Sequence, residues 1–195
     1  MPVVRRNVAF MSKATARLRS AVAPLSTREE RRAIEAARAH LSKELSPRYR
    51  VFGADLRIDK PASPATTPKR TIAVLILDYE KRRTLEAIVN VAGKVFRVLD
   101  LQGFQPAFLD DEVKEARAIA ARDERVARIR KQRGSFVTAF APDQDHSPRR
   151  RQVGLRYAAP DARVGIRLLA EAAVDLIDRR LVHFEEFPRS EHKGG

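Results

Sequence analysis

The stretch EAIVNVAGKVFRVLDLQGFQPAFLDDEVKEA, residues 86–116, decides the fold. Runs rich in Val, Ile and Leu lie on both sides of an Ala-Gly pair, which is typical of two strands joined by a tight turn. A loop with a proline follows, and acidic residues then open a helix. A very similar hairpin returns as EAAVDLIDRRLVHFEEF, residues 171–187, with one extra residue in its turn. A hairpin used twice indicates an internal repeat.

The residues before the first hairpin predict a helix over 26–45. Ser26 and Thr27 are good helix caps, and Thr27 with Glu30 fits a capping box. Apolar residues then recur at helical spacing on one face until Pro47 ends the helix. We expect this helix to pack on a sheet.

Three further stretches complete the first set of elements. Residues 49–58 alternate between apolar and polar, as in a half-buried strand, and 71–79 is the most apolar run of the chain. The segment 59–70 between them carries three prolines and small polar residues, so we expect an exposed, mobile loop. With the hairpin over 84–101, the first half of the chain reads as one helix followed by four antiparallel strands.

The second half repeats this plan. A single helix is predicted from Asp110 to Gly134, with Asp110, Asp111 and Glu112 in its first turn and basic residues in its last, an order that suits the helix dipole. Four strands are expected after it, over residues 135–141, 152–158, 164–177 and 181–187.

The predicted fold class is therefore α+β, with two tandem units that each pack one helix on a four-stranded antiparallel sheet. The expected domains are a basic, flexible leader over 1–23, a first unit over 24–103, a second unit over 104–188 and a polar tail over 189–195. A length of 195 residues suits two small domains.

The composition limits the possible functions. The formal net charge is +14, which favours a partner with acidic groups, whether protein or nucleic acid, or simply a solvated basic surface. There is no cysteine, which excludes disulfides, thiolate metal sites and cysteine nucleophiles. No apolar run is long enough to span a membrane, and the first 24 residues lack the apolar core of a secretory signal, so we expect a cytoplasmic protein.

No residue pattern predicts catalysis. His40, His146, His183 and His192 are scattered without metal-ligand spacing. His183 alternates with apolar neighbours on a predicted strand, so its side chain is expected to face solvent. The acidic residues at 110–112 are explained as a helix cap, and phosphate loops, dinucleotide fingerprints and nucleophile elbows are missing. We therefore predict no catalytic, cofactor or metal residues.

Basic residues are concentrated in two stretches, RVARIRKQR over 125–133 and PRRRQ over 148–152. Such clusters attract phosphates or carboxylates, and nucleic-acid binding through them would be non-specific, because the strands lack paired aromatic residues for stacking bases. A solvated helix end and an exposed loop would look the same. The candidate contact surface comprises Arg125, Arg128, Arg130, Lys131, Arg133, Arg149, Arg150 and Arg151.

The order of these elements resembles the second and third N-terminal domains of copper amine oxidases. The matching stretches are PLSTREERRAIEAARAHL for the opening helix, YEKRRTLEAIVNVAGKVFRVLDLQGFQPAFLDDEVKEARAIAARDERV for the domain junction and GLRYAAPDARVGIRLLAEAAVDLIDRRLVHFEE for the closing hairpin. They cover about residues 24–187. The resemblance implies two helix-on-sheet domains that precede a large catalytic domain in that family.

The chain departs from the family in two respects. Arg179 stands where the family has a turn glycine, and we expect the longer turn to hold it without a positive φ. The family's Asn-Tyr-Asp/Glu motif, whose tyrosine becomes topaquinone, is missing, because none of Tyr49, Tyr79 and Tyr157 follows an asparagine. The catalytic aspartate and the three copper-binding histidines are missing too.

The resemblance implies a part in amine metabolism without chemistry in this chain. We expect a non-catalytic accessory protein that docks on a separate amine oxidase catalytic chain, or on a copy of itself. Copper and topaquinone would then belong only to the partner. Two alternatives stay open: a basic nucleic-acid-associated protein, and a truncated amine oxidase relic.

Overall fold

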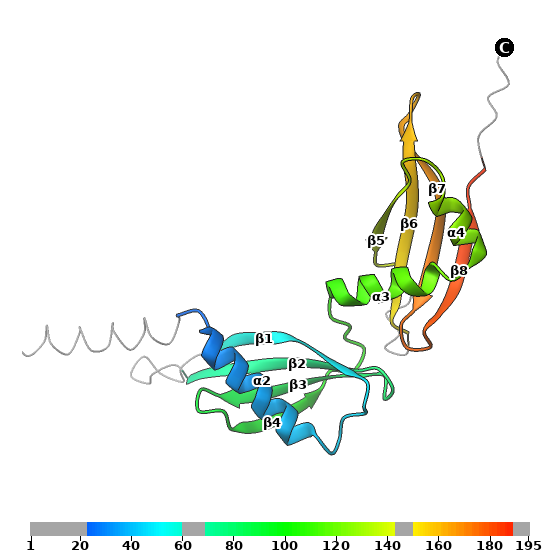
Figure 1. Cartoon of the computed structure of the whole chain (residues 1–195). Coiled ribbons are helices and arrows are strands. Elements are labelled where there is room, and N and C mark those ends of the chain that lie inside the picture. Colours follow the sequence, from blue (N-terminus) through cyan, green and yellow to red (C-terminus); the bar gives the residue numbers. More distant parts are fainter. Residues whose placement is uncertain (1–22, 60–68, 143–149, 189–195) are drawn as a thin grey trace, which may run out of the picture. The chain divides into compact units, whose positions relative to one another are not determined.

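The computed structural model describes residues 23–59, 69–142 and 150–188. The chain divides between Gln102 and Gly103 into two compact units, and each holds one layer of helix and one antiparallel sheet (Figure 1). The predicted leader, apart from its last residue, lies outside the described residues. So do the tail over 189–195 and most of the proline-rich loop.

The first unit has the predicted order of one helix and four strands. Its sheet has the order β1-β2-β3-β4 with every neighbour antiparallel, and α2 lies across one face of it (Figure 1). The elements are α2 (Thr27–Leu41), β1 (Tyr49–Asp59), β2 (Lys69–Asp78), β3 (Arg83–Asn90) and β4 (Val95–Asp100).

The core of the first unit forms between α2 and the two central strands. Alternate residues of a strand point to the same face, and helix residues three or four apart share one side, so the two apolar faces meet. The buried residues of this cluster are Ala33, Ala37, Leu41, Ile72, Val74, Ile76, Leu85, Ala87 and Val89. The apolar periodicity predicted this helix face from the sequence.

The cap of α2 differs from the predicted one by a single residue. Ser26, rather than Thr27, is the N-cap, and its capping box is closed by Glu29 rather than Glu30. The Glu29 backbone N–H donates to Ser26 Oγ at 3.3 Å, and the Ser26 backbone N–H donates to the Glu29 carboxylate at 2.9 Å. Thr27 becomes the first helical residue.

The second unit repeats the sheet of the first. The strand order is β5-β6-β7-β8, again antiparallel throughout. The elements are α3 (Asp110–Ala120), α4 (Glu124–Arg130), β5 (Phe136–Phe140), β6 (Gln152–Asp161), β7 (Gly165–Asp175) and β8 (Arg180–Glu186). The predicted α+β class with two helix-on-sheet units is confirmed.

The helical segment of the second unit is two helices rather than the predicted one. α3 ends at Ala120, and Asp123 caps a new helix by accepting a hydrogen bond from the Arg125 backbone N–H at 2.9 Å. Ile119, Val126 and their neighbours are buried on both sides of the break. The apolar spacing therefore runs through the break and conceals it in the sequence.

The repeated hairpins share a β-bulge at the same position. In the first unit the register shifts between Ile88 and Val89, and in the second it shifts between Ala173 and Val174. These pairs are aligned by the repeated sequence. A bulge at the same position in both hairpins adds to the similarity of the two sheet units.

The turn of the second hairpin contradicts one expectation. Arg179 has φ 52°, so it adopts the left-handed conformation that was expected to be avoided there. Its counterpart region in the first hairpin uses Gly93 at φ 86°. A residue with a Cβ in this region is disfavoured by roughly 1–2 kcal/mol.

Replacing Arg179 with glycine is expected to raise the free energy of unfolding of the second unit by up to about 1 kcal/mol, because glycine removes the Cβ strain but is more flexible when unfolded. The change also removes a 3.4 Å ion pair with Glu115, in which the Arg179 side chain is 59% exposed and the Glu115 side chain 19%. Arg179→Ala loses the same ion pair and keeps the Cβ, so it serves as the control. Urea denaturation should rank glycine above alanine; the reverse order would show that the turn is unstrained.

Candidate contact surface and the duplicated arginine clamp

Two of the predicted contact residues on α4 already have partners. Arg125 pairs with Asp123 at 2.9 Å and lies over the Phe184 ring at 4.7 Å. Arg128 pairs with Glu186 at 2.5 Å. Both side chains are more than half exposed, so these are surface pairs that a partner's carboxylate or phosphate could rearrange at small cost.

The remaining predicted residues at the end of α4 carry the uncompensated charge. Arg130, Lys131 and Arg133 are all exposed. Within the part of the chain that the structure describes, none of the three takes part in a salt bridge. Three adjacent cations therefore remain available at one place on the surface.

A groove of about 530 Å³ lies beside these cations. Arg133 and Arg167 line it together with apolar residues from α4, β6 and the end of β8. Arg167 pairs in register with Ala159, which also lines the groove. Arg167 carries no signal of this role in the sequence, because it stands alone among apolar residues of a predicted strand.

The second basic stretch does not join this surface. Arg149 lies outside the described residues, and Arg150 is exposed just before β6 begins. Arg133 lines the groove together with Pro160, and Pro160 lies at the other end of β6. A strand of this length separates its ends by roughly 30 Å. The predicted residues that the structure describes therefore do not form one patch.

Arg151 corrects the prediction most clearly, because its side chain is only 3% exposed. Its Nε and Nη2 atoms donate to the two carboxylate oxygens of Glu112 at 3.0 and 2.7 Å. Nη1 and Nη2 donate to the carbonyl oxygens of Pro106 and Ala107 at 2.5 and 3.1 Å. The guanidinium also stacks over the Phe108 ring at 4.3 Å. Arg151 is therefore buried and is not a contact residue. We call the pair of Arg151 and Glu112 the arginine clamp of the second unit.

Glu112 therefore has a larger role than the predicted helix-dipole contact. Its carboxylate is fully buried, and it accepts from the Leu109 backbone N–H at 3.0 Å besides pairing with Arg151. Asp110 and Asp111 are exposed, as a simple dipole role requires. One glutamate thus joins the start of α3 to the start of β6 and fixes the chain that enters the second unit.

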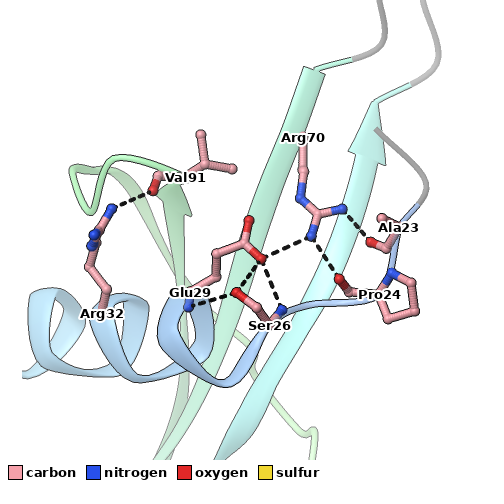
Figure 2. A network of polar contacts seen from close by, with 7 residues as sticks. All are labelled: Ala23, Pro24, Ser26, Glu29, Arg32, Arg70 and Val91. Carbon is pink, nitrogen blue, oxygen red and sulfur yellow. Dashed lines mark hydrogen bonds and ion pairs between the residues drawn. The ribbon is translucent and has the colours of Figure 1, made fainter. Parts of the chain in front are cut away.

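The first unit holds the same clamp in a more open form (Figure 2). Arg70 Nη2 donates to Glu29 Oε2 at 3.2 Å and to the Pro24 carbonyl at 3.1 Å, and Nη1 donates to the Ala23 carbonyl. The Ser26 backbone N–H donates to the same carboxylate oxygen. The arginine side chain is 13% exposed and the glutamate 27%.

The two clamps occupy equivalent positions in their units. Each glutamate lies three residues after the helix N-cap and accepts from the N-cap backbone N–H. Asn90 ends β3, and its strand partner directly follows Arg70. Asp175 ends β7, and its strand partner directly follows Arg151. Each donates to two carbonyls in the segment before the N-cap. The clamp is thus part of the duplicated design.

The hydrogen bonds of the first clamp change the acidity of its glutamate. The Ser26 backbone N–H and hydroxyl, followed by Arg70, hold the pKa of Glu29 below its ordinary value of 4.5. They do so because each donor favours the charged carboxylate. Because the folded-state pKa of Glu29 is the lower one, its contribution to the stability of the first unit is present above the unfolded-state pKa. This contribution is lost as the pH falls through the folded-state pKa.

The described histidines do not come together. His40 is exposed on α2 and His183 is exposed on β8, as predicted for His183. His146, His192, Asp143 and Asp145 lie outside the described residues. Within the described ranges, no group of three or more His, Asp or Glu side chains is placed to hold a metal ion. In the same ranges no helix is long and apolar enough to cross a membrane.

Comparison with known proteins gives no family for this chain. No family model matches the sequence, and no curated protein matches it either. The function is therefore argued from the two units themselves.

Proposed function

We propose that this chain is a non-catalytic accessory protein that docks on a separate amine oxidase catalytic chain. The observation that carries the proposal is the pair of helix-on-sheet units in tandem, with their boundary between Gln102 and Gly103. That arrangement agrees with the tandem N-terminal domains that the sequence resembles. Copper and topaquinone would belong to the partner, and this chain would supply binding surface only.

The charge distribution indicates the kind of partner. Arg130, Lys131 and Arg133 are exposed without salt bridges within the described residues, so an acidic surface on the partner would meet them without first breaking an ion pair. Complementary charge of this kind speeds association and selects the partner more than it adds affinity. The same three cations are the observation that favours the second candidate, a nucleic-acid-associated protein.

A pull-down from the protein's own host tests the proposal. The tagged chain is incubated with cell extract at moderate salt, and the eluate is identified by mass spectrometry, stained for quinone and assayed for amine-dependent peroxide. We expect a quinone-positive partner with oxidase activity. An eluate that contains nucleic acid, or no partner at all, would overturn the proposed function.

A further inference from the structure

The groove at the end of α4 lies where the helical layer of the second unit stops but the sheet continues. The β6–β7 hairpin extends past α4 (Figure 1). Ala159 and Arg167 pair in the part of the sheet beyond the buried Tyr157, and both line the groove. A sheet face without a helix above it leaves apolar surface and side-chain donors open to a ligand.

The floor of this groove is apolar and firmly held. Ile129 is 1% exposed and Leu169 is 3% exposed, so both belong to the core of the unit and also line the groove. The Phe187 backbone N–H donates to the Leu169 carbonyl at 2.9 Å, which fixes the end of β8 along one side. Pro160 is exposed and Phe187 is half-buried, and both line the groove, so an apolar side chain of a ligand would contact these two residues rather than the buried Ile129 and Leu169.

The rim of the groove is cationic. Arg133 and Arg167 line it, and within the described residues neither forms a salt bridge. Arg130 and Lys131 end α4 next to this rim, and Arg163 lies in the adjoining hairpin turn. Two arginines that line one concave surface favour a carboxylate ligand, because guanidinium groups form strong charge-assisted hydrogen bonds with carboxylate oxygens.

The carboxylates near the groove are already engaged. Glu186 lines it but pairs with Arg128 at 2.5 Å. Asp161 accepts from the backbone N–H groups of Arg163 and Val164 in the hairpin turn, at 2.9 and 3.3 Å. The Asp161 carboxylate also interacts electrostatically with Arg163 and Arg167 and offsets part of their charge, whereas Arg133 forms no salt bridge within the described residues.

We propose that this groove binds an acidic segment of a partner protein, with a carboxylate between Arg133 and Arg167 and an adjacent apolar side chain against Pro160 and Phe187. The mixture of apolar floor and cationic rim favours a peptide over nucleic acid, because a phosphate backbone needs a track of cations rather than a half-apolar hollow. The proposal rests on the docking role above for the identity of the partner, but not for the chemistry of the ligand.

The test uses the full chain and labelled probes in fluorescence anisotropy at moderate salt. The probes are a peptide of about ten residues that alternates glutamate and leucine, a peptide that alternates glutamate and serine, and a single-stranded oligonucleotide of similar length. We expect the glutamate–leucine peptide to bind most tightly. Because no oxidase chain is present, failure here is distinct from failure of the pull-down.

Charge reversal locates the site. Arg133→Glu with Arg167→Glu is expected to weaken binding of the glutamate–leucine peptide by about tenfold or more. The milder Arg133→Gln with Arg167→Gln should weaken it less, and it keeps the test valid if the reversed variant folds poorly. Arg28→Glu with Arg31→Glu, on the exposed face of α2, changes the net charge equally and should leave binding within about twofold.

Three results would overturn the inference. Equal weakening by the Arg28/Arg31 control would show general charge attraction. Tighter binding of the oligonucleotide, lost on reversal at Arg133 and Arg167, would assign the groove to nucleic acid. Absence of measurable binding to the glutamate–leucine peptide would show that the groove does not bind such segments.

Discussion

Replacing Arg151 with methionine is expected to lower the free energy of unfolding of the second unit by roughly 3–5 kcal/mol. The change removes the Arg151 guanidinium from the fully buried Glu112 carboxylate, and it removes the donors to the Pro106 and Ala107 carbonyls. A buried charge without its partner costs far more than the pair itself contributes. Amide hydrogen exchange, read by mass spectrometry for each unit, measures the loss.

The first unit supplies the matched control. Arg70→Met breaks the equivalent clamp, but Glu29 is 27% exposed and can turn to water, so we expect a loss of only about 1 kcal/mol. The double variant Glu112→Leu with Arg151→Met should recover a large part of the loss, because it removes the unpaired charge. Equal losses from Arg70→Met and Arg151→Met would show that burial does not distinguish the two clamps.

Replacing Asp78 with alanine is expected to destabilise the first unit by about 3 kcal/mol, because hydrogen bonds to a buried charged group each contribute about 1.5–3 kcal/mol. Asp78 is fully buried at the end of β2. It accepts from the Ser46 backbone N–H at 2.9 Å, from Ser46 Oγ at 2.6 Å and from the Lys81 backbone N–H at 3.1 Å. It thus joins the chain after α2 to the β2–β3 turn.

The same aspartate makes the first unit sensitive to acid. Burial would raise the pKa of Asp78, but the hydrogen bonds from Ser46 and Lys81 outweigh it and hold the pKa below the ordinary 3.8. Its stabilisation is therefore present above about pH 4 and is lost as the pH falls through the lower folded-state value. In Asp78→Ala the acid-induced loss of stability should be smaller.

The control for Asp78 is the aspartate that ends β6. Asp161→Ala removes two backbone hydrogen bonds in an exposed turn, and we expect only a small loss of stability. Hydrogen exchange at pH 7 and at a pH well below 4 compares the two variants. A loss at Asp161 as large as at Asp78 would contradict the importance of burial.

The sequence predicted the strands and the duplication well, because alternating apolar residues and turn residues are local signals. In the repeated hairpin in particular, the turn residues and the alternating apolar residues indicate how the two strands pair. The break between α3 and α4 was missed because the apolar spacing continues through it and only the cap at Asp123 marks the new start. The strain at Arg179 was missed because a turn's length does not determine its φ.

The clamps were missed for a different reason. Glu112 and Arg151 lie 39 residues apart in the chain, so their contact depends on the register between helix and sheet rather than on any local pattern. Each residue was explained locally, as a helix-dipole charge and as part of a basic run. Alignment of the two helix starts shows a glutamate at the third helical position twice. An arginine also stands at the start of the second strand twice, as the second residue of β2 and directly before β6.

In the proposed function, this chain would dock on an amine oxidase catalytic chain through the cationic end of its second unit. The most direct test repeats the host pull-down with the wild type, Arg133→Glu/Arg167→Glu and Arg28→Glu/Arg31→Glu. We predict a quinone-positive partner with the wild type and the Arg28/Arg31 variant, and its loss with the Arg133/Arg167 variant. Equal recovery by all three would contradict the assigned surface, and no quinone-positive partner with any of them would contradict the docking role itself.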